Sequence, residues 1–297
     1  EAGLRAAAAE AGPHTLWVPT DVADADAVEA AAARVEAELG PIDAWVNNAM
    51  TTVFAPSWEV TAEEFRRATE VTYLGQVHGT LAALRRMRPR DRGTVCNVGS
   101  ALAYRAIPLQ SAYCGAKFAV RGFTEAVRSE LLHEGSHVRL TEVHLPAVNT
   151  PQFEWCLNRM PGHPRPVPPV YGPDVAAERI VLAVESPRRH RVLGGFNRFL
   201  IAASQVAPGV VDHYVARTAV EAQQLDVPAD PGAPADLWAP VDDTGDHGSR
   251  GRFGDLEGGM RNRRWLATVP RLVVDVAAAA VDRGREVVRA PAGRARR

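Results

Sequence analysis

NVGS at residues 97–100 and SAYCGAK at residues 111–117 are the two short sequences from which the rest of the chain is interpreted. The first ends an apolar run that predicts a strand, and the second opens a predicted helix. In that helix Tyr113 and Lys117 are four residues apart and share one face. A nearby ammonium favours the ionised phenol, so we expect Lys117 to lower the pKa of Tyr113. Ser100 would hold the oxygen that gains or loses the proton.

The Tyr-x-x-x-Lys spacing by itself is common, and an isolated copy more often marks a solvated helix face than a catalytic pair. The order of the surrounding elements changes this interpretation. With its strand, serine loop and helix in succession, the chain resembles the classical short-chain dehydrogenase/reductase family, whose serine, tyrosine and lysine match Ser100, Tyr113 and Lys117. This resemblance implies an NAD- or NADP-dependent oxidoreductase that interconverts a secondary alcohol and a ketone or aldehyde, with Tyr113 as the acid or base.

Apolar runs that alternate with Ala-rich segments predict an α/β fold, built on a doubly wound parallel sheet of the Rossmann type. We expect the longest helices at 61–87, opened by a capping box, and at 111–133. The predicted strands are 15–19, 42–46, 93–98, 138–145 and 190–193. The resemblance extends over about residues 1–196, which we expect to form this domain.

Several segments are expected outside or above the sheet. Residues 151–173 are rich in Pro and aromatic side chains and suit a mobile flap over a substrate. Beyond the domain we expect a helical extension at 197–225, a disordered linker rich in Pro, Gly and Asp at 226–260, and a C-terminal helix with a basic tail at 261–297.

Polar residues follow four of the apolar runs, and ligands of parallel sheets bind beyond the carboxyl ends of the strands. These clusters predict an extended ligand across one sheet edge. The cofactor contacts that the resemblance implies are Asp21, Val22, Asn48, Tyr113, Lys117, Val148 and Thr150. Asp21 and Asn48 have an ordinary alternative, since turn side chains of these types often bond their own backbone.

The chain departs from the family pattern at several positions. Met50 replaces the glycine of the family's Asn-Asn-Ala-Gly sequence, and Thr72 stands where the family has an asparagine beside a proton-relay water. Thr72 is therefore a candidate fourth catalytic residue that cannot copy the amide, although its hydroxyl can bend a helix.

The family's opening strand and glycine-rich turn have no counterpart before Glu1, so we expect an incomplete N-terminus. Because that segment distinguishes the two nicotinamide cofactors, the choice between NAD and NADP stays open. A catalytically inactive binding or scaffold protein of the same fold is the alternative function.

Composition narrows the possible partners. Lys and Arg total 34 against 35 Asp and Glu, so the net charge of -1 indicates neither nucleic-acid nor membrane binding. The three cysteines form no CxxC pair and the histidines show no metal-site spacing, so surface or helix-end positions explain the histidines better. The isolated thiols indicate a reducing cytosol and no apolar run is long enough for a membrane span, so we expect a cytoplasmic protein. The resemblance implies a small-molecule alcohol or carbonyl substrate. The helices at 61–87 and 111–133 are those through which the family forms homo-oligomers.

Overall fold

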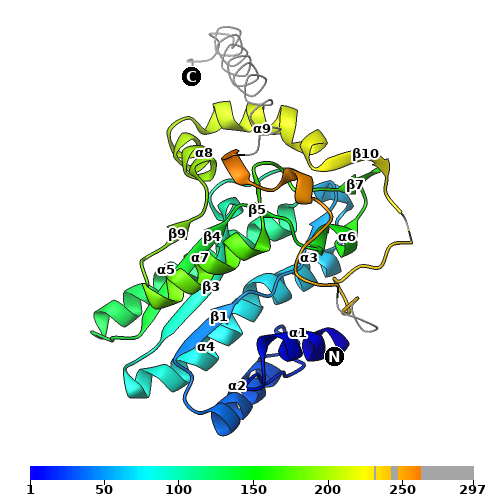
Figure 1. The fold of residues 1–297 in the computed structure, drawn as a ribbon. Coiled ribbons are helices and arrows are strands. Elements are labelled where there is room, and N and C mark those ends of the chain that lie inside the picture. Colours follow the sequence, from blue (N-terminus) through cyan, green and yellow to red (C-terminus); the bar gives the residue numbers. More distant parts are fainter. Residues whose placement is uncertain (231, 242–246, 262–297) are drawn as a thin grey trace.

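The computed structural model describes residues 1–230, 232–241 and 247–261. At its centre is a four-stranded sheet in the order β1-β3-β4-β9, with every neighbouring pair parallel (Figure 1). The strands are Ala44–Asn47 (β1), Thr94–Ser100 (β3), Arg139–Leu145 (β4) and Arg191–Val192 (β9). Because they are parallel, their carboxyl ends lie along one edge, where the predicted polar residues after β1, β3 and β4 lie together.

Helices cover both faces of this sheet, which confirms the predicted α/β class. The helices on one face are Ala25–Leu39 (α2), Gly75–Met87 (α4) and Ser111–His133 (α5), whose buried residues pack together around Val95 and Leu140. The other face carries Pro173–Glu185 (α7), which packs on Cys96 and Val143. Val95 and Cys96 point to opposite faces because side chains alternate along a strand.

Before α4, the predicted helix at 61–87 contains a break. Ala62–Thr69 (α3) begins at Thr61 with the expected capping box, and Glu70–Leu74 then form a π-helical turn. Thr72, fully buried, lies in this turn. Its hydroxyl donates to the Thr51 carbonyl at 2.9 Å and accepts from the Thr51 N–H at 3.0 Å. Both hydrogen bonds of the Thr72 hydroxyl thus go to the loop that contains Thr51, and not to the helix in which Thr72 lies.

Smaller elements rise beyond the carboxyl edge of the sheet. The segment predicted as an irregular flap contains a short helix and strands that pair with distant parts of the chain. The elements of this region are Val53–Phe54 (β2, paired with β6), Ala147–Val148 (β5, paired with β8), Gln152–Trp155 (α6), Leu157–Asn158 (β6), Gly162–Pro164 (β7, paired with β10), Val170–Tyr171 (β8), Gly195–Val206 (α8), Pro208–Ala222 (α9) and Gln224–Pro228 (β10). In Figure 1, α8 and α9 lie across the top of this region.

The described residues also include a first helix, Ala2–Ala11 (α1), and five short 3-10 turns. These turns are Ser57–Glu59, Arg88–Arg90, Ala101–Ala103, Gly254–Leu256 and Gly259–Arg261. Residues 15–19 are not a strand, contrary to expectation, because they pair with no neighbour among the described strands. No helix in the described part of the chain is long and apolar enough to cross a bilayer.

The segment expected to be a disordered linker is packed where it is described. Leu237 is fully buried against Val53, Ala55, Ala68 and Ala112. Phe253 contacts a second buried cluster with Phe54, Phe153 and Cys156. The low apolar content of this segment suggested disorder. Its few large apolar side chains are nevertheless buried against the domain, and this burial favours a packed conformation. The predicted C-terminal helix and basic tail fall on residues 262–297, outside the described residues.

We predict that Leu237→Ala lowers the free energy of unfolding by about 2–5 kcal/mol, because it leaves a cavity in a fully packed site. Chemical denaturation with fluorescence detection measures this change. Val227→Ala, in the same part of the chain but half exposed, is the matched control and should change stability by less than about 0.5 kcal/mol. Equal effects of the two substitutions would contradict the packing of Leu237.

Thr72→Val should lower the free energy of unfolding by about 1–3 kcal/mol, because it leaves the buried backbone groups of Thr51 without their partner. Thr72→Ser keeps the hydroxyl and should cost clearly less. Thermal melting of both variants checks this expectation. If serine and valine destabilise the protein equally, the hydroxyl contributes nothing at this position.

Candidate active site

A cavity of about 1040 Å³ lies at the carboxyl edge of the sheet. Its floor is formed by the end of β3, residues 98–100, and by the first turns of α5. The loop after β4 forms one wall, and residues of the flap, of the loop before α5 and of α7, α8 and α9 contribute to the rest of the lining. The expected ligand site at the sheet edge is therefore a real hollow, with a mostly apolar lining.

Ser100, Tyr113 and Lys117 all line this cavity. The Ser100 hydroxyl lies next to the Tyr113 side chain, and it accepts a hydrogen bond from the Leu102 N–H at 3.1 Å. The Lys117 ammonium donates to the Val98 carbonyl at 2.7 Å and lies 5.6 Å from the centre of the Tyr113 ring. The structure thus brings together the three residues that the sequence singled out.

The pKa of the Tyr113 phenol shifts in the direction opposite to the predicted one. Burial raises this pKa above its usual range, although part of the ring faces the cavity, and the neighbouring Ser100 hydroxyl only partly opposes the rise. Burial also lowers the pKa of Lys117 to about 8, against the opposing charge of Glu142. The phenol pKa is therefore raised and not lowered as predicted, because burial outweighs the contributions that oppose it.

A polar network beneath the cavity was not anticipated from the sequence. Gln76, in α4, donates through Nε2 to the same Val98 carbonyl that Lys117 uses, at 3.1 Å. Asn47 donates to the Asn97 side-chain oxygen at 2.8 Å, and Asn97 donates to the Thr124 hydroxyl at 2.9 Å. Polar side chains inside apolar runs were the signal available for this network, which links β1, β3, α4 and α5.

His144 is a further buried polar side chain that contacts Ser100. His144 is fully buried, which corrects the expected surface position, and burial lowers its pKa to about 3. The ring is therefore neutral: Nδ1 lies 3.2 Å from the Ser100 carbonyl, and Nε2 lies 3.1 Å from the Tyr104 hydroxyl. These distances assign the proton to Nδ1, with Tyr104 donating to Nε2. Burial raises the pKa of the neighbouring Glu142 to about 7.

The remaining candidate residues divide into two groups. Asn48, Val148 and Thr150 line the cavity with the Ser-Tyr-Lys group. Asp21 and Val22 lie outside its lining: the half-exposed Asp21 carboxylate pairs with Arg67, and the Val22 carbonyl lies 3.0 Å from the His78 ring. Thr72, held by Thr51, also does not line the cavity.

The donors and acceptors on the cavity wall fit the nicotinamide half of a dinucleotide. Lys117 uses one of its three N–H groups on Val98, and Ser100, Asn48 and Thr150 add hydroxyl and amide groups. A ribose with its hydroxyls and a carboxamide match these groups in kind. The cavity volume also leaves room for a small substrate beside them.

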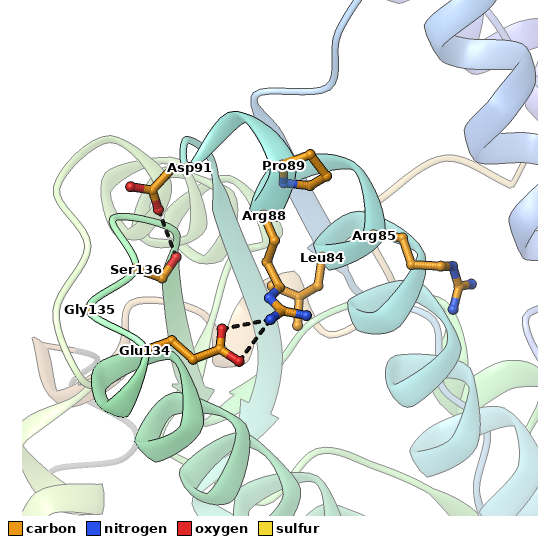
Figure 2. A pocket seen from close by; sticks show the side chains of 8 residues that line it. All are labelled: Leu84, Arg85, Arg88, Pro89, Asp91, Glu134, Gly135 and Ser136. Carbon is orange, nitrogen blue, oxygen red and sulfur yellow. Dashed lines mark hydrogen bonds and ion pairs between the residues drawn. The ribbon is translucent and has the colours of Figure 1, made fainter.

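Another hollow, of about 600 Å³, lies between the loops after α4 and α5. Figure 2 shows that Arg88 reaches both Glu134 carboxylate oxygens, at 2.8 and 2.7 Å, and that Asp91 accepts from Ser136. Arg85 points away from these groups and pairs with Glu29 outside the lining. With its charges paired, this hollow offers no reactive group. No cluster of metal-ligating side chains occurs in residues 1–230, 232–241 and 247–261.

Comparisons with known proteins agree with this geometry. The uncharacterized oxidoreductase YxnA of Bacillus subtilis is 31% identical over 233 residues, which are 77% of this chain and 65% of that protein. The 3-dehydrosphinganine reductase of Danio rerio is 33% identical over 139 residues, 46% of this chain and 41% of its own length. The chain thus spans less than two thirds of these relatives.

A solved structure and a family model extend the comparison. The crystal structure of a short-chain dehydrogenase from Streptomyces avermitilis matches with a TM-score of 0.55 and 27% sequence identity, over 64% of this chain and 75% of that one. The model of the short chain dehydrogenase family matches residues 1–156, more than half of the 297 residues. The resemblance found in the sequence is confirmed, and the chain belongs to the short-chain dehydrogenase family.

Proposed function

We propose that this protein is an NAD- or NADP-dependent oxidoreductase that interconverts a secondary alcohol and a ketone or aldehyde. One observation carries the proposal: Ser100, Tyr113 and Lys117 line one cavity at the carboxyl edge of the sheet, with Ser100 next to Tyr113. Relatives named as oxidoreductases, one of them a reductase, support the same class of reaction.

In the direction of reduction, Tyr113 is the proton donor. Its raised pKa keeps the phenol protonated at neutral pH, which suits a general acid better than a general base. Ser100 holds the carbonyl oxygen beside the phenol, and the Lys117 ammonium stabilises the negative charge that remains when the proton has left. The nicotinamide, when bound, supplies the hydride.

The chain's own residues also hold the cofactor in this proposal. Lys117 and Asn48 bind the ribose side, Val148 contacts the carboxamide through its backbone, and Thr150 lies toward the pyrophosphate. Asp21 and Val22 contact the adenine end. Arg67 pairs with the Asp21 carboxylate at 2.9 Å and orients it. Both NAD and NADP are included, because these residues do not discriminate between them.

Self-association belongs to the same proposal. α4 and α5, which cover one face of the sheet, leave Leu81, Phe118 and Leu132 exposed by 41%, 43% and 68%. A second copy of the chain would cover these apolar side chains, as the family resemblance led us to expect.

Titration with NADH and NADPH, followed by fluorescence, tests cofactor binding directly. Binding of neither would overturn the proposed function and favour a non-catalytic binding protein. If either binds, Tyr113→Phe should reduce turnover by about 10²-fold or more while leaving the cofactor dissociation constant nearly unchanged, because only the proton donor is lost. Turnover by the phenylalanine variant at the wild-type rate would refute the role of the phenol.

The rate of reduction should fall as the pH rises through about 8. Burial lowers the pKa of Lys117 to about 8, so its charge is present below that pH and lost above it, while the phenol stays protonated. The pH profile of kcat/KM measures this descent. Lys117→Arg keeps a cation at every pH used and should remove the descent near pH 8. A descent at the same pH in the arginine variant would assign it to another group.

A further inference from the structure

Glu142, on β4, is a buried carboxylate that the proposed reaction does not use. Its side chain is 3% exposed, and its Oε1 has no hydrogen-bond partner among the described residues. This oxygen lies 3.5 Å from the Nδ1 of His144, whose proton goes to the Ser100 carbonyl. A carboxylate without a hydrogen bond destabilises a folded protein when it is buried. Its place beside the candidate active site therefore calls for an explanation.

The Glu142 carboxylate lies close to the backbone that binds Lys117. Strands β3 and β4 are paired with Asn97 opposite Glu142. From there the glutamate side chain reaches Gly99, where an added Cβ would come within 2.5 Å of the Glu142 Oε1. The Lys117 ammonium lies 2.7 Å from the carbonyl of Val98, the residue before Gly99. By bond geometry, these contacts place the carboxylate and the ammonium at most about 10 Å apart.

The attraction between these two charges is only weakly screened. Lys117 is 1% exposed and Glu142 is 2% exposed, so little solvent reaches either group. The charge of Glu142 raises the pKa of Lys117 against the lowering by burial, and Lys117 is the charged residue that lowers the pKa of Glu142 most.

Other titratable groups surround this pair, and their own partners leave Glu142 as the carboxylate that faces Lys117. Among the cations, Arg121 pairs with Glu125 at 3.2 Å, and Arg128 donates to two backbone carbonyls. Burial lowers the pKa of both nearby histidines, so they are neutral. The full set is Tyr113, Arg121, Glu125 and Arg128 on α5, Cys96 on β3, His144 on β4, Tyr104 in the loop after β3, and Arg189 and His190 before β9.

The residue type at position 117 makes this carboxylate important. Lys117 is the only lysine among the 297 residues, and elsewhere the chain uses arginine for positive charge. An arginine stays charged at any pH in ordinary use, whereas a buried lysine keeps its proton only where the surroundings favour the charged form. A cation at this site thus depends on a negative charge nearby.

We propose that Glu142 is a positioning residue that acts through Lys117: its carboxylate keeps the ammonium charged and so extends the reaction to higher pH. The part that concerns the reaction rests on the proposed function, and the effect on the charge of Lys117 does not. Glu142 contacts neither substrate nor cofactor in this proposal. Gly99 belongs to the same arrangement, because a side chain there would occupy the place of the Glu142 oxygen.

The single lysine allows a direct test that needs no turnover. Lysine labelled with ¹³C at Cε gives one side-chain NMR signal, and the pH dependence of this signal reports the pKa of Lys117. Glu142→Gln removes the charge and nearly keeps the shape, so it should lower this pKa by at least about half a pH unit. Glu125→Gln is the matched control. Its carboxylate, 38% exposed and paired with Arg121, should have a clearly smaller effect.

Thermal melting checks that each variant folds. If Glu142→Gln does not fold, Glu142→Leu takes its place, because it removes the unpaired oxygen together with the charge. The expected lowering of the Lys117 pKa is the same for leucine as for glutamine.

The pH profile of kcat/KM connects the charge of Lys117 to the reaction. In Glu142→Gln, the descent near pH 8 should move to lower pH by the same amount as the NMR midpoint. A merely structural loss would instead lower kcat/KM equally at every pH. Combined with Lys117→Arg, the Glu142→Gln substitution should leave the position of the profile unchanged, because the arginine does not titrate.

An unchanged Lys117 pKa in a folded Glu142 variant would refute this inference. If the pKa falls but the descent of kcat/KM stays in place, Glu142 holds the charge of Lys117 and its effect on the reaction is refuted. Failure of the proposed function is distinguishable from both outcomes. If neither NADH nor NADPH binds, the oxidoreductase is refuted, and the NMR titration still decides whether Glu142 keeps Lys117 charged.

Discussion

The hydrogen bond from the Lys117 ammonium to the Val98 carbonyl, 2.7 Å long, is the interaction on which the geometry of the site depends. This bond joins α5 to the carboxyl-terminal part of β3. The Lys117 side chain that makes it is almost fully buried. A buried ammonium is costly unless it is bonded, so this contact keeps the helix at one height along the strand. Tyr113, one turn before Lys117, is thereby held beside Ser100 at the end of the same strand.

Around this contact the core of the domain is unusually polar for its depth. Asn47, Gln76, Asn97 and Thr124 are all buried and hydrogen-bonded to one another or to the backbone. Each bond lost from this network would leave a further buried polar group unpaired, beside the Gln76 Oε1 that already has no partner among the described residues. The network therefore favours one arrangement of the carboxyl edge of the sheet.

The domain and the segments above it contribute differently to the site. Sheet strands and α5 supply the reacting side chains, and these elements are common to the family. The α8–α9 pair adds mostly apolar side chains to the cavity lining, Leu200 and Ile201 among them. Asn149 ties the segment at 251–253 to the loop after β4 through hydrogen bonds to Gly251 and Phe253. Much of the cavity lining therefore comes from residues outside β3 and α5.

The sequence alone determined those features that rest on neighbours in the chain. Helix 111–133 has its predicted limits, Thr61 forms the predicted capping box, and Ser100, Tyr113 and Lys117 share a cavity as expected, because periodicity, caps and spacing are local properties. The tertiary structure decided the rest. Burial reversed the expected direction of the Tyr113 pKa shift, and Arg105 pairs with Asp212, more than a hundred residues further along the chain. Such contacts join residues far apart in the chain, and desolvation depends on everything packed around a group, which no short pattern encodes.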